Sequence, residues 1–152
     1  MPEARGYLLD TNIVLLATRQ DSRVSDAIDA QFQLGASRFR PAICEVTIAE
    51  LLAFATAWSS ARRDRLSEII RQMLVIEISE PGTRERWAEL YSHAKSGGMG
   101  IQHHHNDVWI AAATHVSGLT LLSTDGAAFL PLCNTPWLDV VLIDPKTGLV
   151  LA

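Results

Sequence analysis

The sequence predicts an α/β domain with a mostly parallel central sheet of about five strands and helices on both faces of that sheet. Five short apolar runs are spread along the chain, and each is followed by a helix-like segment or a turn, without internal repeats. Strands that alternate with helices form parallel sheets, because each helix carries the chain back across the sheet. With 152 residues, of which 48% are hydrophobic and 20% charged, we expect one domain over residues 1–152.

The first third of the chain contains two predicted strands and two predicted helices. Residues 7–9 are a short apolar run and are predicted to form the opening strand. Residues 13–19 are helix-like, and residues 22–34 carry apolar side chains at near-helical spacing. A break at Gly35 leads into a second predicted strand at residues 39–44.

The middle third is predicted to be mainly helical. Residues 47–58 and 61–73 have helical patterns, and the second of these segments is rich in arginine. A third strand is predicted at residues 74–78. Pro81 and Gly82 then form a turn that leads into a helix extending to about Ser96.

The last third begins after a break at residues 97–100, which include three glycines. A helix is predicted from about Asn106 to Gly118, because glycine commonly terminates helices. A fourth strand is predicted at residues 119–122. After a short helix, a fifth strand is expected at residues 140–143.

Four acidic residues lie at the ends of these predicted elements. Asp10 and Asp125 directly follow strands, while Glu50 and Asp107 fall in the first turns of predicted helices. Ligands of open parallel sheets bind at the carboxyl ends of the strands, so we expect the four carboxylates to converge there. A carboxylate cluster without cysteine is typical of a hard-metal site, and such sites commonly act on phosphate esters.

Each acid also has a purely structural interpretation. Asp10 and Asp125 suit the N-cap position of a following helix, and Thr47-x-x-Glu50 has the form of a capping box. Asp107, in a first turn, suits the helix dipole. The residues that flank the four acids favour the functional interpretation.

Those flanking residues resemble the four acidic motifs of PIN-domain nucleases, in order and in rough spacing. The matching segments are LLDTN at 8–12, TIAEL at 47–51, NDVWIAA at 106–112 and LSTD at 122–125. The resemblance extends over about residues 7–143. Within the family, the chain looks most like the compact VapC toxins of toxin–antitoxin (VapBC) pairs.

The resemblance implies an endoribonuclease that depends on Mg²⁺ or Mn²⁺ and hydrolyses RNA phosphodiester bonds. The implied catalytic and metal-binding residues are Asp10, Glu50, Asp107 and Asp125. The implied supporting polar residues are Thr11, Asn12, Asn106, Ser123 and Thr124. Ser123 stands where threonine is usual, and residues 126–129 lack the further acid that the family often has, so the number of bound ions stays open.

Two other functions stay open besides a toxin: a housekeeping RNA-processing nuclease of the same fold, and a non-catalytic PIN-like binding module. The resemblance to VapC toxins implies RNA as the substrate, a homodimer and a small cognate antitoxin as partner. The net charge is −4, and without the four acids the chain has 13 basic and 13 acidic side chains. A local basic patch is therefore the feature to look for.

Several further features have two interpretations each. Four arginines of the predicted helix at 61–73 could guide RNA or could form a solvated helix face. Three consecutive histidines precede Asn106, and they could contact a substrate phosphate, bind a metal ion, or form a solvated loop before the helix. These residues are Arg62, Arg63, Arg65, Arg71, His103, His104 and His105. Cys44 and Cys133 are expected to be free thiols in a cytoplasmic protein, and no apolar run approaches the ~20 residues of a membrane span.

Overall fold

The structure of the protein is a computed structural model that describes residues 6–35, 40–96, 105–132, 136 and 138–151. Within these residues, five strands form one sheet in the order β3-β2-β1-β4-β5, and every neighbouring pair is parallel. The strands are β1 (Tyr7–Leu9), β2 (Ala42–Cys44), β3 (Leu74–Ile76), β4 (Thr120–Ser123) and β5 (Val140–Leu142). The predicted α/β class with a parallel five-stranded sheet is therefore confirmed.

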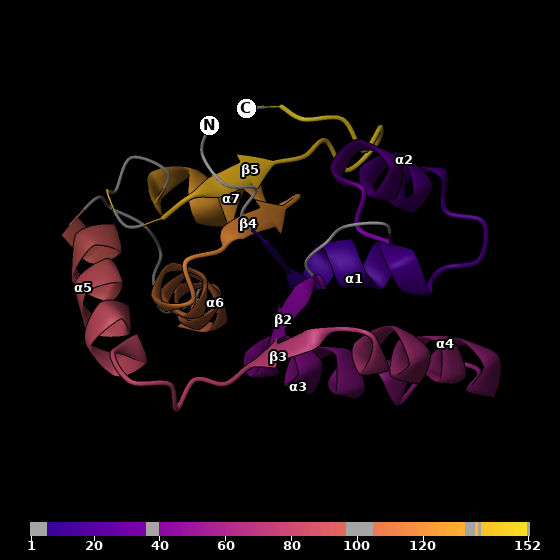
Figure 1. Ribbon diagram of the computed structural model, residues 1–152, viewed down its shortest axis with the longest axis horizontal. Coiled ribbons are helices and arrows are strands. Elements are labelled where there is room, and N and C mark those ends of the chain that lie inside the picture. Colours follow the sequence, from indigo (N-terminus) through magenta and orange to yellow (C-terminus); the bar gives the residue numbers. More distant parts are fainter. Residues whose placement is uncertain (1–5, 36–39, 97–104, 133–135, 137, 152) are drawn as a thin grey trace.

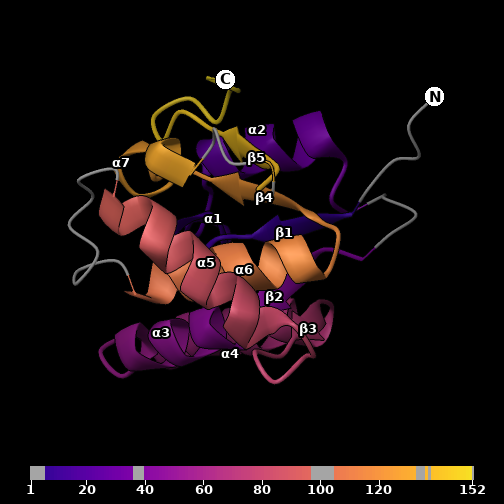
Figure 2. The same cartoon turned by 90° about the vertical axis from the view of Figure 1, so that its left-hand side faces the viewer.

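Helices cover both faces of the sheet, as predicted. They are α1 (Thr11–Thr18), α2 (Arg23–Phe32), α3 (Glu45–Ala55), α4 (Ser60–Arg71), α5 (Thr83–Ser96), α6 (His105–Val116) and α7 (Gly126–Phe129), and a 3₁₀ helix follows at Leu130–Leu132. Figure 1 shows α5 and α6 on one side of the sheet and α1 and α2 on the other. Turning the molecule by 90° brings α5 and α6 to the front (Figure 2).

Among the described residues, the core consists of two apolar clusters, one on each face of the sheet. Leu8 and Leu121 point into a cluster with α5 and α6, whereas the adjacent Leu9 and Leu122 point into a cluster with α1, α2 and α4. This division follows from the strand geometry, because successive side chains alternate between the two faces. A strand buried on both faces is rich in apolar residues: β1 and β2 are apolar throughout, whereas β4 has two leucines in its middle and the buried polar residues Thr120 and Ser123 at its ends.

Two helix starts differ from the prediction. The helix α1 begins at Thr11 instead of Ile13, because Asp10 is its N-cap and accepts a hydrogen bond from the Thr11 amide. The helix α3 begins at Glu45, immediately after β2, so Glu50 lies in its second turn and not in its first. The capping-box interpretation of Thr47 and Glu50 is therefore wrong.

The carboxyl end of α6 follows the predicted signal, whereas β3 ends at Ile76 instead of Ile78 and α3 ends at Ala55 instead of Trp58. The carboxyl end of α6 has glycine in the left-handed conformation: Gly118 has φ +68°. The Gly118 amide donates to the His115 carbonyl oxygen at 3.0 Å, and the Leu119 amide donates to that of Thr114 at 3.1 Å, which is the Schellman motif. The predicted strand at 39–44 is shorter in the structure, and Phe39 lies outside the described residues.

The strand order determines where a ligand can bind. From β1 the chain proceeds outward to β2 and β3, and it then returns to place β4 on the other side of β1. Such a reversal leaves a crevice at the carboxyl ends of the two central strands. Asp10 leaves β1 at this position, and its amide donates to the Leu122 carbonyl oxygen of β4 at 3.0 Å. In the described part of the chain, no helix is long and apolar enough to cross a membrane.

Candidate active site

Asp10 lies at the end of β1, and its buried carboxylate accepts two hydrogen bonds. Asp10 as a whole residue is 3% exposed. Oδ1 accepts a hydrogen bond from the Thr11 amide at 2.8 Å, and Oδ2 accepts one from the Ser123 hydroxyl at 2.6 Å. One donor comes from α1 and the other from β4, so this carboxylate joins the two sides of the crevice.

The surroundings of Asp10 disfavour its charged form. Burial raises the pKa of this carboxyl from 3.8 to about 7, although the hydrogen bonds from Ser123 and Thr11 act in the opposite direction. The negative charges of Asp107 and Asp125 raise the pKa further. Three of the four predicted acids are therefore close enough to interact electrostatically.

Ser123 connects the first acid to the fourth. It is the last residue of β4 and is fully buried. Its hydroxyl donates to Asp10 and accepts a hydrogen bond from the Asp125 amide at 2.9 Å. The Asp125 carboxylate in turn accepts from the Ala128 amide at 3.0 Å and caps α7. A single hydroxyl thus fixes the backbone of one acid and the side chain of another.

Glu50, on α3, is connected to the site by a hydrogen bond from Thr11, which lies on α1. The Thr11 hydroxyl lies 2.8 Å from Glu50 Oε1, and it also lies 3.1 Å from the Thr47 hydroxyl. Because Thr11 directly follows Asp10, this contact ties the second acid to the first turn of α1. Glu50 is half-buried, whereas both threonines are buried.

Asp107 lies in the first turn of α6, as predicted, and is half-buried. Its charge acts on Asp10, so the amino end of α6 faces the same crevice. Of the predicted supporting residues, Thr11 and Ser123 make direct hydrogen bonds to the acids. Asn12 and Asn106 are exposed and Thr124 is half-buried. The functional roles of all five supporting residues stay predictions.

Capping explains only part of this arrangement. Asp10 and Asp125 do cap helices, so the structural interpretation of these two residues is correct as far as it goes. An N-cap needs only one acceptor at the helix start, and a neutral serine or asparagine serves equally well. Capping does not require a carboxylate to be buried beside two others, which makes its ionisation unfavourable.

The donor chemistry of the site fits a hard divalent cation. No three His, Cys, Asp or Glu side chains among the residues described are already arranged to hold a metal ion. The available donors are nevertheless carboxylate and hydroxyl oxygens, which Mg²⁺ prefers. A cation would also remove the repulsion that disfavours a charged Asp10 between Asp107 and Asp125.

The arginines of α4 are engaged mainly in structural contacts. The Arg62 Nε donates to the Thr18 hydroxyl at 3.1 Å, and the Arg65 Nε donates to the Thr18 carbonyl oxygen at 3.0 Å. Both bonds attach α4 to the carboxyl end of α1. Arg71 pairs with Glu68 on the same helix. These contacts favour a structural role for this helix face over the RNA-guiding one.

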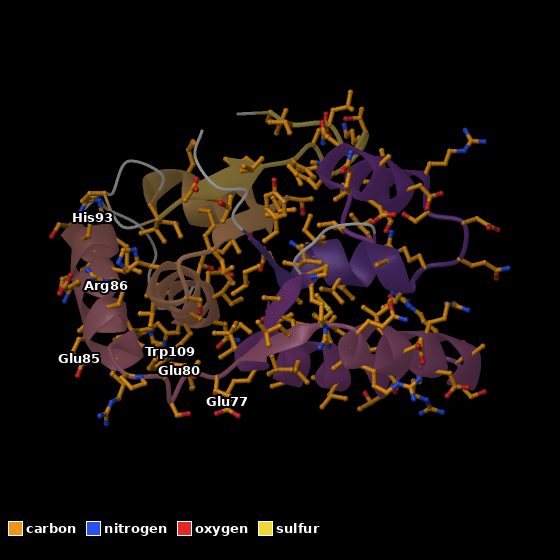
Figure 3. All side chains as sticks on the ribbon, in the orientation of Figure 1. Glu77, Glu80, Glu85, Arg86, His93 and Trp109 are labelled. Carbon is orange, nitrogen blue, oxygen red and sulfur yellow. The ribbon has the colours of Figure 1, made fainter. Side chains whose placement is uncertain are left out.

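Trp109 is half-buried and packs between helices. It lies between α6 and the start of α5 (Figure 3), and its ring centroid is 5.3 Å from that of Trp87. His105 is exposed, and its ring is 6.1 Å from that of Trp87. His103, His104, Cys133 and Trp137 lie outside the described residues. Cys44 is a free, buried thiol, as expected.

A parallel sheet with carboxylates gathered at its switch point defines an α/β domain with an acidic site. The family model of the PIN domain matches residues 7–130, so this chain belongs to the PIN-domain family. A search of curated proteins found no match.

Solved structures share the fold at low sequence identity. A chain of VapBC2 from Rickettsia felis, solved bound to a promoter DNA fragment, matches with a TM-score of 0.73 and 21% identity, over 91% of this chain and 98% of that chain. A chain of VapBC-5, a toxin–antitoxin system from Mycobacterium tuberculosis, matches with a TM-score of 0.66 and 23% identity, over 92% and 100%. A chain of FitAcB from Neisseria gonorrhoeae matches with a TM-score of 0.65 and 22% identity, over 92% and 98%.

Proposed function

We propose that this protein is a divalent-metal-dependent endoribonuclease and the toxin of a VapBC-type pair. PIN domains are a family of nucleases that generally use divalent metal ions. The observation that carries the proposal is the buried Asp10 carboxylate, whose pKa is raised by burial and by the charges of Asp107 and Asp125. An acid with these neighbours is expected where a cation is to be bound.

Four side chains would hold the ion: Asp10, Glu50, Asp107 and Asp125. When bound, Mg²⁺ or Mn²⁺ supplies charge that polarises the scissile phosphate and activates the attacking water. Ser123 orients Asp10 and the backbone at Asp125, while Thr11 orients Glu50. These hydroxyls prepare the carboxylates before the substrate arrives, which limits the reorganisation needed during the reaction.

The nuclease is tested by incubating purified protein with a mixed RNA pool in Mg²⁺, in Mn²⁺ or in EDTA, beside Asp10→Asn. Asparagine keeps the shape and the capping oxygen of Asp10 but removes the charge. We expect cleavage that requires the metal and is lost in Asp10→Asn, with product ends that lack 2′,3′-cyclic phosphates, because water is the nucleophile. Absence of both cleavage and metal binding in the folded protein would instead favour a non-catalytic module.

The antitoxin is the second part of the proposal. VapBC-5 from Mycobacterium tuberculosis, which shares the fold, is a member of a family of toxin–antitoxin systems. In this chain a cavity of about 360 Å³ opens between α1, α2 and α4, and its lining includes the apolar side chains of Leu9, Ile13, Ile28 and Met73. Leu9 and Ile13 flank Asp10 in sequence. An antitoxin segment with apolar side chains would bind in this cavity, whose lining residues do not include the four acids.

Expression in a bacterial host separates a toxin from a housekeeping nuclease. We expect growth arrest on expression of the wild type, no arrest with Asp10→Asn, and relief when a small neighbouring gene is co-expressed. The purified complex is expected to contain a homodimer of this chain, which its mass in solution would reveal. Normal growth with an active wild-type enzyme would favour the RNA-processing nuclease.

A further inference from the structure

A chain of two buried hydroxyls supports the Glu50 carboxylate. The Thr11 hydroxyl lies within hydrogen-bond distance of both Glu50 Oε1 and the Thr47 hydroxyl, at 2.8 and 3.1 Å. An ionised carboxylate has no hydrogen to donate, and a hydroxyl has only one. When the Thr11 hydrogen points to Glu50, the contact between the two hydroxyls is a hydrogen bond only if Thr47 donates to the Thr11 oxygen.

The position of Thr47 in α3 suits this arrangement. Thr47 and Glu50 are three residues apart in the helix, so their side chains lie on the same side of it. Thr47 is completely buried and Thr11 is 7% exposed, whereas Glu50 is half-buried. The two hydroxyls thus form a fixed support from which a more exposed carboxylate extends.

Thr11 also connects this support to Asp10. The amide of Thr11 donates to Asp10 Oδ1 at 2.8 Å, while its hydroxyl donates to Glu50. A rotation of the Thr11 side chain would therefore break the link between the first and second acids. The Thr47 hydroxyl, 3.1 Å from that of Thr11, gives Thr11 a second hydrogen-bond partner in the observed orientation.

We propose that Thr47 is a positioning residue of the acidic site, which orients Glu50 through the Thr11 hydroxyl. The proposal rests on the proposed function, because an orientation of Glu50 matters only if Glu50 binds the metal ion. Thr47 is completely buried, so it would act on Glu50 without contacting a substrate. Its capping role is excluded by the start of α3 at Glu45, so the hydroxyl has no part in the helix start.

The test compares Thr47→Val, which removes the hydroxyl and keeps the shape, with Thr47→Ser, which keeps the hydroxyl. Calorimetric titration with Mn²⁺ gives a readout independent of catalysis. We expect Thr47→Val to weaken Mn²⁺ binding by about 10–100-fold, the range typical of residues that orient metal ligands. Thr47→Ser should bind Mn²⁺ nearly as the wild type does, and the KM for RNA should not change in either variant.

A matched control comes from α6. Thr114 is also a completely buried helical threonine, but its hydroxyl donates to the Ile110 carbonyl oxygen at 2.7 Å and not to a residue of the acidic site. Thr114→Val is therefore expected to change stability without changing Mn²⁺ affinity. If Thr114→Val and Thr47→Val weaken Mn²⁺ binding equally, the effect is a general one of core polarity and the positioning role is overturned.

A double-mutant cycle tests whether Thr47 acts through Glu50. In the Glu50→Gln background, we expect Thr47→Val to cause little further loss of residual Mn²⁺ affinity, whereas full additivity would overturn the proposal. Wild-type Mn²⁺ affinity in Thr47→Val would also overturn it, with the nuclease left intact. A wild type that binds no Mn²⁺ would overturn both proposals. If circular dichroism shows that Thr47→Val is unfolded, Thr47→Ala removes the hydroxyl without the added methyl group.

Discussion

At the scale of single residues, Asp10 combines two roles that are usually separate. It caps α1, and it lies buried with its charged form disfavoured by burial and by Asp107 and Asp125. The sequence predicted both interpretations for this residue, because a position that follows a strand and precedes a helix suits either one. Only its burial, and the hydrogen bond from Ser123, distinguish the site from an ordinary cap.

The stability of the metal-free protein should reveal this unfavourable charge. The pKa of Asp10 is about 7 in the folded state and 3.8 in the reference state, so between these pH values the folded protein binds more protons. Stability therefore falls as pH rises through this window. Asp10→Asn lacks this loss, and we expect it to be more stable than the wild type by roughly 1–3 kcal/mol at pH 8, and about equally stable at pH 4.

Urea unfolding in EDTA at both pH values measures this difference. Asp64→Asn, on an exposed position of α4, is the control and should not change the pH dependence. If Asp10→Asn were instead destabilised equally at pH 4 and pH 8, Asp10 would be acting as a cap alone.

At the scale of elements, periodicity predicted the strands and helices well and the start of α3 poorly. The α3 helix follows β2 without a connecting residue, and its N-cap, Cys44, makes no side-chain capping bond. The sequence therefore has no capping residue at the true start of α3, and Thr47 was the first residue that resembled an N-cap. The true start at Glu45 moves Thr47 into the helix, where its hydroxyl faces Thr11.

A comparison of two glycines with positive φ, Gly118 and Gly148, tests how closely the turn that contains Gly148 must pack against α2. Gly118 has φ +68° with open space around it, whereas Gly148 has φ +76° and an added Cβ would lie 2.7 Å from the Val24 carbonyl oxygen of α2. Both substitutions by alanine carry the cost of the left-handed conformation, about 1 kcal/mol. Only Gly148→Ala also pushes the turn that contains Gly148 away from α2. We expect Gly148→Ala to lose roughly 1–3 kcal/mol more than Gly118→Ala in urea unfolding.

Equal losses in the two glycine variants would show that the turn at residues 144–148 can move away from α2 at little cost. In that case the hydrogen bond from the Gln31 side chain to the Gly148 carbonyl oxygen, at 3.2 Å, does not hold the turn in place.

At the scale of the whole molecule, topology explains why the site could be predicted at all. Residues that follow parallel strands lie at the same edge of the sheet. From this rule we predicted that Asp10 and Asp125 are close in space although they are far apart in the chain, and β1 and β4 are indeed neighbouring parallel strands. The hydroxyl contacts could not be predicted in the same way. They depend on how closely α1 packs against α3 and on side-chain rotamers, which periodicity does not specify.

Binding of a divalent ion should stabilise the folded protein by mass action. At a Mn²⁺ concentration 100-fold above the dissociation constant, the expected gain is about 2.7 kcal/mol. We expect the melting temperature of the wild type to rise with Mn²⁺ and to return with EDTA, and that of Asp10→Asn to stay constant. An equal rise in Asp10→Asn would mean that the ion binds elsewhere.

The most direct test of the acidic site is to locate a bound ion. Crystals of the protein soaked in Mn²⁺ can be measured at a wavelength where manganese scatters anomalously. We predict a peak in the anomalous map between the carboxylates of Asp10, Asp107 and Asp125, with Glu50 nearby. A peak at another place, or none at a Mn²⁺ concentration that supports RNA cleavage, would contradict the account of these four acids as one metal site.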